Sequence, residues 1–229
     1  MSKMYSEELE KYITRERLEP YLKLTNGDFE MAVRLYVLYT KINESLYFPL
    51  QNVELTVRNS FYKIIAEKYG DNWIFDTKYL LKGRDKSNDL LIKQINLAIE
   101  RKKRKQINID DLISNLSFGF WTTLLDSNFE VFFWRPCLRK LFRKSSNVLL
   151  RKEIQTEIKF IKEARNRIFH HENLLKYNLL DTYNKITSFI GLISEEFASW
   201  TREQSSFIHH YANLQNFLEE NQISMGFDR

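Results

Sequence analysis

The apolar residues of this chain recur at helical spacing along nearly its whole length, and few residues interrupt the pattern. The 229 residues include 6 glycines and 3 prolines, too few for the many turns of a β-sandwich. Spacings of three and four place apolar side chains on one face of a helix. The sequence therefore predicts an all-α protein with long helices and short connections.

Capping and breaking residues suggest where the helices begin and end. Asp28 is an expected N-cap, Pro49 suits a first helical turn, and Gly70 is expected to end a helix. A break is expected near Ser117 and Gly119. No linker rich in Gly, Ser or Pro divides the chain, so residues 1–229 are predicted to form a single domain. Helices are predicted over residues 29–47, 49–69, 85–104, 147–173, 179–198 and 202–220, with two short helices within 108–126.

Charge and cysteine content limit the class of protein. Lys plus Arg exceed Asp plus Glu by 35 − 30 = 5, a mild excess that permits nucleic-acid binding without requiring it. The one cysteine, Cys137, has no partner for an intrachain disulfide and is interpreted as structural. The N-terminal residues lack the apolar core of a signal peptide, and no stretch approaches the roughly 18 apolar residues of a membrane span. We expect a soluble, cytoplasmic protein with no membrane partner.

A run of five cations, Arg101-Lys102-Lys103-Arg104-Lys105, has two interpretations of about equal weight. It is either a solvated helix end, because cations favour helix C-termini, or a nucleic-acid-binding patch that contacts phosphates. The second interpretation follows because five adjacent cations repel one another unless an anion is near.

One eight-residue segment, 165–172 with the sequence RNRIFHHE, concentrates the chemically active side chains. On a continuous helix Asn166 and His170 share a face, because they are four residues apart. Arg167 and His171 share the neighbouring face for the same reason. The segment can therefore present cations, an amide and imidazoles to one anionic ligand.

Metal-free cleavage of RNA needs these types of side chain. A base must take the proton of the ribose 2′-hydroxyl and an acid must protonate the leaving 5′-oxygen, and histidine can do either because it titrates near neutrality. The long side chain of Arg165 can swing toward the cleft of His170 and offer a planar fork to phosphate oxygens. A two-fold dimer would supply a second histidine and a second arginine.

Other interpretations of these histidines remain open. Adjacent histidines on a helix are more often a polar rim than a catalytic site. A metal site is disfavoured, because no Cys or carboxylate cluster stands at zinc-ligand spacing. A second pair, His209-His210, has no arginine partner and is interpreted as surface or interface.

The spacing Arg165-Asn166-x-x-x-His170 resembles the arginine-to-histidine motif of the HEPN superfamily, in which a polar residue, often Asn, follows the arginine. The longer segment, ending in His-His-Glu, resembles the Abi-like (AbiD/AbiF-type) proteins of bacterial abortive infection. Further elements similar to that family follow in order from about residue 15 to about residue 175. They are Arg17-Leu18-Glu19-Pro20-Tyr21-Leu22, Leu35-Tyr36, Leu46-Tyr47-Phe48-Pro49-Leu50, Glu54-x-x-x-Arg58-Asn59, Tyr69-Gly70-Asp71-Asn72-Trp73 and Leu116-Ser117-Phe118-Gly119-Phe120-Trp121.

The resemblance implies an α-helical HEPN bundle, here with additional N- and C-terminal helices, which usually forms a homodimer with the two motifs facing each other. It implies a metal-independent endoribonuclease without a cofactor, acting on RNA in antiphage defence. An antitoxin or a phage-encoded trigger is a further candidate partner. In this chain Arg165 and His170 are then the catalytic candidates, and Asn166 orients them or the phosphate.

The resemblance also gives a set of supporting candidates: Arg167, His171, Glu172, Glu54, Arg58 and Asn59. The last three either line the same cleft or form a buried polar network that fixes helix packing, and the network is favoured. Family membership does not establish chemistry, so a non-catalytic HEPN module that binds RNA or a protein is the alternative function. A DNA-binding regulator is the least favoured, because no convincing helix-turn-helix is evident.

Overall fold

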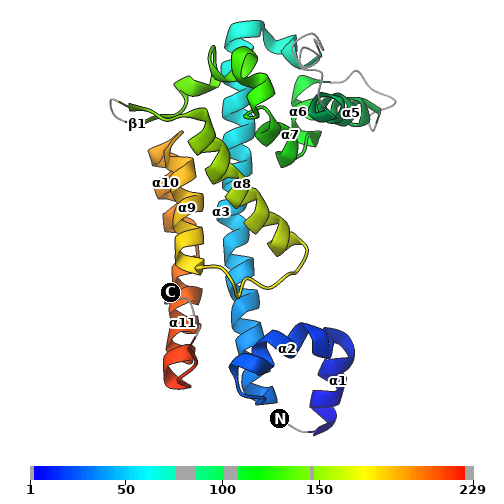
Figure 1. The fold of residues 1–229 in the computed structure, drawn as a ribbon, viewed down its shortest axis with the longest axis vertical. Coiled ribbons are helices and arrows are strands. Elements are labelled where there is room, and N and C mark those ends of the chain that lie inside the picture. Colours follow the sequence, from blue (N-terminus) through cyan, green and yellow to red (C-terminus); the bar gives the residue numbers. More distant parts are fainter. Residues whose placement is uncertain (1–2, 76–85, 101–107, 145–146, 225–229) are drawn as a thin grey trace.

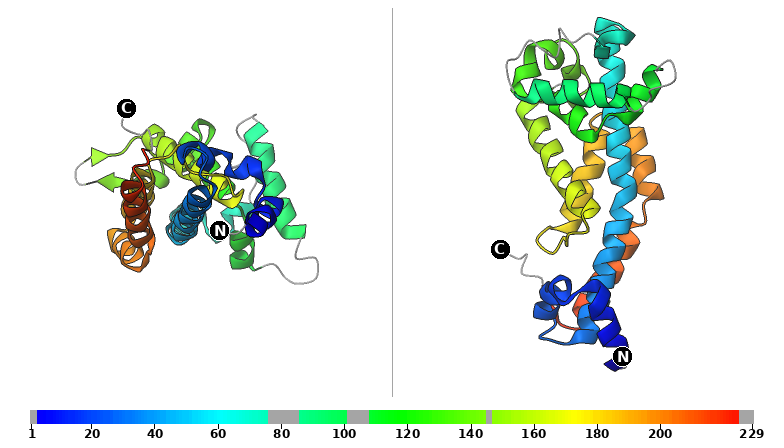
Figure 2. Two further views of the ribbon diagram at one scale, coloured as in Figure 1. Left: turned by 90° about the horizontal axis from the view of Figure 1, so that it is seen from below. Right: turned by 90° about the vertical axis from the view of Figure 1, so that its right-hand side faces the viewer.

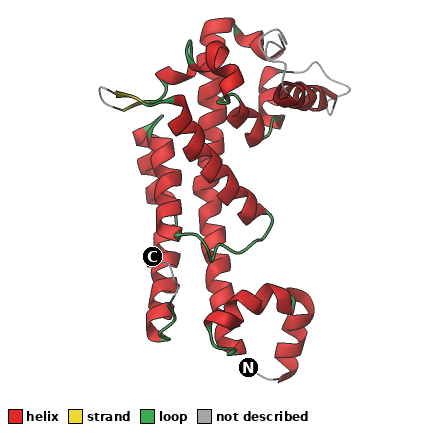
Figure 3. Ribbon diagram, viewed as in Figure 1, coloured by secondary structure: helices red, strands yellow, loops and turns green. Residues whose placement is uncertain are grey.

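One long helix, α3 (Phe29–Tyr69), forms the spine of the molecule (Figure 1). The computed structural model describes residues 3–75, 86–100, 108–144 and 147–224. These residues form helices joined by loops, with one short hairpin (Figure 3). With 41 residues, α3 is about 60 Å long. The predicted all-α class is confirmed for the described residues.

Helices pack at the N-terminal end of α3 and along one of its sides (Figures 1 and 2). At the N-terminal end lie α1 (Lys3–Ile13) and α2 (Arg15–Leu24). Along the side lie α9 (Leu179–Gly191), α10 (Glu195–Gln204) and α11 (Phe207–Glu220).

The other end of α3 carries a group of short elements, from which α8 (Arg151–Phe169) returns alongside α3 toward α2 (Figure 2). The hairpin before α8 pairs two antiparallel strands of two residues each. The elements of this group are η1 (Asp71–Phe75), α5 (Lys86–Glu100), α6 (Ile109–Asn115), α7 (Phe118–Thr123), η2 (Ser127–Phe129), η3 (Glu130–Trp134), η4 (Leu138–Lys140), β1 (Arg143–Lys144) and β2 (Asn147–Val148).

A continuous hydrophobic cluster joins these groups of helices to α3. It extends from Tyr21 of α2 to Leu218 of α11 and includes residues of α3 from Ala32 to Ile65. Ile161 and Ile168 of α8 belong to the same cluster. Packing therefore holds the C-terminal half of α8 against the core, and the 165–172 segment starts within that half.

The predicted helix boundary at Pro49 is wrong. α3 passes through Pro49, which is buried within it. A proline inside a helix removes one backbone hydrogen bond and crowds the carbonyl four residues earlier, at a cost of about 3 kcal/mol. Burial of residues on both sides of Pro49, such as Leu46 and Leu50, offsets that cost. Gly70 ends the helix as predicted, with φ of 85°.

Two short helices within 108–126 are confirmed as α6 and α7, capped by Asn108 and Ser117. Three other predicted helices have wrong bounds. The helix predicted over 147–173 is shorter, because β2 precedes it and the chain leaves the helix after Phe169. The helix predicted over 179–198 ends at Gly191, and Ser194 caps a new helix by accepting from Phe197 N at 3.3 Å. The helix predicted over 202–220 begins later, at Phe207 as α11, because α10 extends to Gln204.

Candidate functional site

The 165–172 segment spans the end of α8 and the turn that follows it. His170 is the C-cap, and His171 has a positive φ of 56°. The backbone N–H of His171 bonds to Ile168 O at 3.0 Å, and that of Glu172 bonds to Arg167 O at 2.9 Å. This pair of bonds is a Schellman motif, in which glycine usually takes the left-handed position. His171 occupies that position here.

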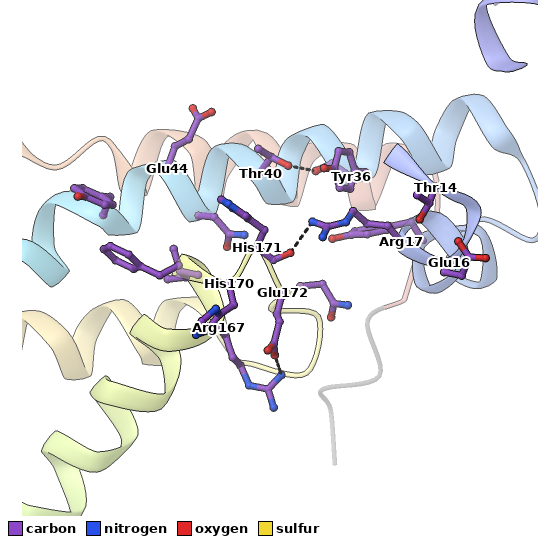
Figure 4. A pocket seen from close by; sticks show the side chains of 16 residues that line it. Thr14, Glu16, Arg17, Tyr36, Thr40, Glu44, Arg167, His170, His171 and Glu172 are labelled. Carbon is purple, nitrogen blue, oxygen red and sulfur yellow. Dashed lines mark hydrogen bonds and ion pairs between the residues drawn. The ribbon is translucent and has the colours of Figure 1, made fainter. Parts of the chain in front are cut away.

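The turn alters the predicted arrangement of side chains. Asn166 and His170 keep the i, i+4 relation, because His170 N bonds to Asn166 O at 2.9 Å. The prediction that Arg167 and His171 share a helix face is wrong, because the left-handed residue lies beyond the helix. Arg17 of α2 donates from Nη1 to the carbonyl oxygen of His171 at 2.9 Å, which ties the turn to α2 (Figure 4).

A cavity of about 790 Å³ lies between α2, α3 and this turn. α3 contributes a line of side chains to its wall at helical spacing, including Tyr36, Thr40 and Glu44 (Figure 4). The end of α8 and the turn contribute both histidines, His170 and His171. Elements distant in sequence therefore meet around one opening.

The two imidazoles at this cavity are exposed and available to a ligand. Neither His170 nor His171 is buried, and within the described part of the chain no hydrogen bond or ion pair engages either ring. Asn43 also lines the cavity, and its Oδ1 atom is buried without a hydrogen-bond partner. A buried acceptor left unpaired costs about 1–3 kcal/mol. Among the described residues, the two imidazoles and Asn43 Oδ1 thus have no hydrogen-bond partner at the cavity.

The charges around the cavity are mixed. Arg167 Nη1 lies 2.9 Å from Glu172 Oε2, so this arginine is paired at the rim. Glu16 also lines the cavity, and hydrogen bonds from its own backbone and from Thr14 lower the pKa of its carboxyl group. Burial raises the pKa of the Tyr21 phenol well above its usual range, which keeps that hydroxyl neutral. The site is not the uniformly positive cleft that a phosphate-binding surface would favour.

Arg165 does not line this cavity with His170, contrary to the prediction that it swings toward the same cleft. Its Nε donates to Glu54 Oε1 of α3 at 2.8 Å, and both side chains are 28% exposed. Its guanidinium carbon lies 4.0 Å from the centre of the Phe169 ring. Asn166 Oδ1 accepts from Arg165 Nη1 at a long 3.4 Å. The arginine is therefore oriented by three neighbours within one chain.

Glu54, Arg58 and Asn59 were predicted to form one buried polar network, and the structure shows that they do not. Glu54 pairs with Arg165, whereas Arg58 Nε donates to Asn59 Oδ1 at 3.2 Å. Asn59 is exposed, and it lines with Arg58 a separate depression of about 280 Å³ that also includes Tyr62. Glu54 therefore acts with Arg165. Arg58 and Asn59 lie about one helical turn further along α3 than Glu54.

The remaining candidates lie apart from the cavity or outside the described structure. The basic run 101–105 falls outside the described residues. His209 and His210 lie on α11, where a ring nitrogen of His209 is 3.2 Å from Asn213 Nδ2. Burial raises the pKa of the Cys137 thiol. Within the described ranges, no three His, Cys, Asp or Glu side chains gather as a metal site. None of the described helices combines the length and apolar character needed to cross a membrane.

Comparison with known proteins does not add to this geometry. No family model, curated protein or solved structure matches the chain. The side chains around the cavity, and the motif that ends α8, are therefore the basis for a functional proposal.

Several residues of the cavity were missed as site residues from sequence. Arg17, Tyr47 and Phe169 stand next to or within the segments singled out, but no chemical role was predicted for them. Asn43 gave a weak signal, since it is polar on a helix that is otherwise buried along much of its length. Their importance depends on contacts between α2, α3 and α8.

Proposed function

We propose that this chain is a metal-independent endoribonuclease of the HEPN superfamily that acts in abortive infection against phage. The observation that carries the proposal is His170, an exposed side chain that lines the 790 Å³ cavity and whose ring has no hydrogen bond or ion pair with the described residues. It belongs to the segment whose sequence resembles the HEPN motif. Histidine is the side chain best suited to proton transfer near neutral pH.

In the proposed reaction the ribose 2′-hydroxyl attacks phosphorus and the bond from phosphorus to the 5′-oxygen breaks. A base takes the 2′-hydroxyl proton, and an acid delivers a proton to the leaving 5′-oxygen. The products are a 2′,3′-cyclic phosphate and a 5′-hydroxyl. His170 fills one of these roles, and a second copy of the chain in a two-fold dimer supplies the histidine for the other.

Arg165 does not line the cavity itself but packs on Phe169, which does. It is the proposed partner of the phosphate beside that wall, and its ion pair does not prevent this role. A guanidinium group has five N–H donors in a fixed plane. Glu54 takes the Nε donor, and Asn166 Oδ1 lies at 3.4 Å from Nη1, so further donors remain for phosphate oxygens. Glu54 would then orient the fork that stabilises the charge developing on phosphorus.

Incubation of purified protein with RNA in EDTA tests the proposal. Wild type should cut RNA and leave cyclic phosphate ends, and His170→Ala should lower the rate by about a hundredfold or more. His209→Ala removes an exposed histidine elsewhere and should cleave as wild type does. Intact RNA with wild type, or undiminished cleavage by His170→Ala, contradicts the proposal.

A non-catalytic HEPN module that binds RNA or a protein is the second candidate. The observation that favours it is the Arg165–Glu54 ion pair, which neutralises the motif arginine within one chain. Binding of RNA by wild type and His170→Ala with equal affinity, and without cleavage by either, would support this function instead.

A further inference from the structure

We propose that the cavity between α2, α3 and the end of α8 binds one unpaired nucleotide of single-stranded RNA, with its base stacked on Tyr47. The identity of the ligand as RNA rests on the proposed function. The binding mode rests on the geometry of the cavity, argued below from its aromatic wall, its unpartnered polar groups and its cations.

The aromatic wall has a half-exposed ring that is already supported from within the protein. Tyr47 of α3 is 50% exposed and stacks on Phe169 of α8, with ring centres 5.1 Å apart and planes inclined by 26°. Phe169 is itself 38% exposed and contacts the Arg165 guanidinium. Arg165 is held by Glu54. A chain of fixed groups therefore holds an aromatic ring at the cavity with much of its surface open.

Such a ring is the kind of surface on which proteins stack unpaired bases. Every base has a π-face, so stacking tolerates sequence, and each stacked base contributes measurably to affinity. In a duplex the faces of the bases are covered by neighbouring bases, whereas single strands can splay them out. An exposed tyrosine at the edge of a cavity therefore favours a single-stranded ligand over a duplex.

The polar groups of the cavity suit the rest of a nucleotide. Arg17 and Arg167 line the cavity beside His170. Arg17 Nη1 donates to His171 O, and Arg167 Nη1 pairs with Glu172, so each guanidinium keeps further N–H donors for a phosphate group. Asn43, on the same helix as Tyr47, also lines the cavity and adds an amide side chain to its polar wall. A volume near 790 Å³ lies within the range of about 300–1,000 Å³ that is typical of small-ligand sites.

Fluorescence anisotropy with labelled 2′-O-methyl oligonucleotides tests the binding mode, because these strands lack the attacking hydroxyl and stay intact. The probes are a single strand, its duplex, and the same strand with abasic positions. We expect wild type to prefer the single strand to both others. Tyr47→Ala should weaken binding of the single strand by about 5- to 100-fold.

Three further variants separate stacking from folding. Tyr47→Phe keeps the ring and should bind within about twofold of wild type, whereas Tyr47→Leu keeps apolar bulk and should bind as weakly as Tyr47→Ala. Tyr12→Ala removes a 73% exposed tyrosine of α1 that does not line the cavity and should bind as wild type does. Circular dichroism and thermal melting check that every variant is folded.

The outcomes distinguish this inference from the proposed function. Equal binding of single strand, duplex and abasic strand, or unchanged binding by folded Tyr47→Ala, overturns the stacking site. Cleavage of natural RNA by wild type, lost in His170→Ala, would leave the nuclease proposal standing in that case. If the predicted binding pattern is found and no RNA is cut, the nuclease proposal fails and the nucleotide site stands.

Discussion

Disrupting the ion pair between Arg165 and Glu54 tests how firmly the motif arginine is held. Nε lies 2.8 Å from Oε1, and both side chains are 28% exposed. At an effective dielectric constant near 20, two unit charges about 4 Å apart attract by about 4 kcal/mol. Desolvation and the ordering of two long side chains cancel most of this attraction, and exposed pairs retain about 0.2–1 kcal/mol. We expect a coupling energy of about 1–1.5 kcal/mol for this less exposed pair.

A double-mutant cycle measures that coupling. Urea unfolding of wild type, Glu54→Gln, Arg165→Gln and the double variant gives the four free energies of unfolding. Lys41 and Glu44 are the matched control, because their charged atoms are also 2.8 Å apart but their side chains are 49% and 57% exposed. The control should couple by about 0.3–0.5 kcal/mol and should lose more of that coupling in about 0.5 M salt. A coupling for Arg165–Glu54 no larger than the control's would refute the reasoning.

The same substitution reports on the role of Glu54 in the proposed reaction. If Glu54 orients Arg165 toward the transition state, Glu54→Gln should lower kcat by about tenfold and change KM by less than about twofold. Gln keeps the shape of the side chain, so loss of folding is not expected. A rise in kcat would contradict the orienting role and indicate that Glu54 masks the arginine.

Three other predictions concern reactivity, pH and backbone strain. Because burial raises the pKa of the Cys137 thiol, its reaction with a thiol reagent should be at least about a hundredfold slower in native than in unfolded protein. Hydrogen bonds from Arg135 and Arg151 lower the pKa of Glu130, so its contribution to stability is complete above about pH 4.5 and is lost as the pH falls further. Glu130→Gln should flatten the fall in the urea midpoint below that pH. His171→Gly should raise the free energy of unfolding by up to about 1 kcal/mol, because glycine adopts the positive φ of 56° without steric strain.

Each of these predictions has an outcome that contradicts it. Rapid labelling of native protein would show that Cys137 is accessible. An unaltered acid dependence in Glu130→Gln would mean that Glu130 contributes no pH-dependent stability. A less stable His171→Gly would mean that the His171 side chain makes a stabilising contact. His171→Ala is the matched control, because it removes the imidazole but keeps a Cβ at the positive φ.

Local patterns predicted the helical class and most of the helices. Asp28 was recognisable as an N-cap, and its side chain accepts from Met31 N, because capping depends on neighbouring residues in the sequence. Pro49 misled the prediction, because its cost to a helix is local whereas the packing that offsets it comes from distant segments. The loop at 192–194 was missed, because its apolar residues continue the periodicity of α9.

The sequence by itself determined that chemically active side chains gather at 165–172, because a motif is defined by residue types and spacing. Only the tertiary structure decided what these side chains meet. Arg165 pairs with Glu54, and Phe169 stacks on Tyr47, because α3 and α8 lie side by side. His170 lines a cavity because α2 and α3 form its other walls. Contacts of this kind depend on how helices pack, which helical periodicity does not specify.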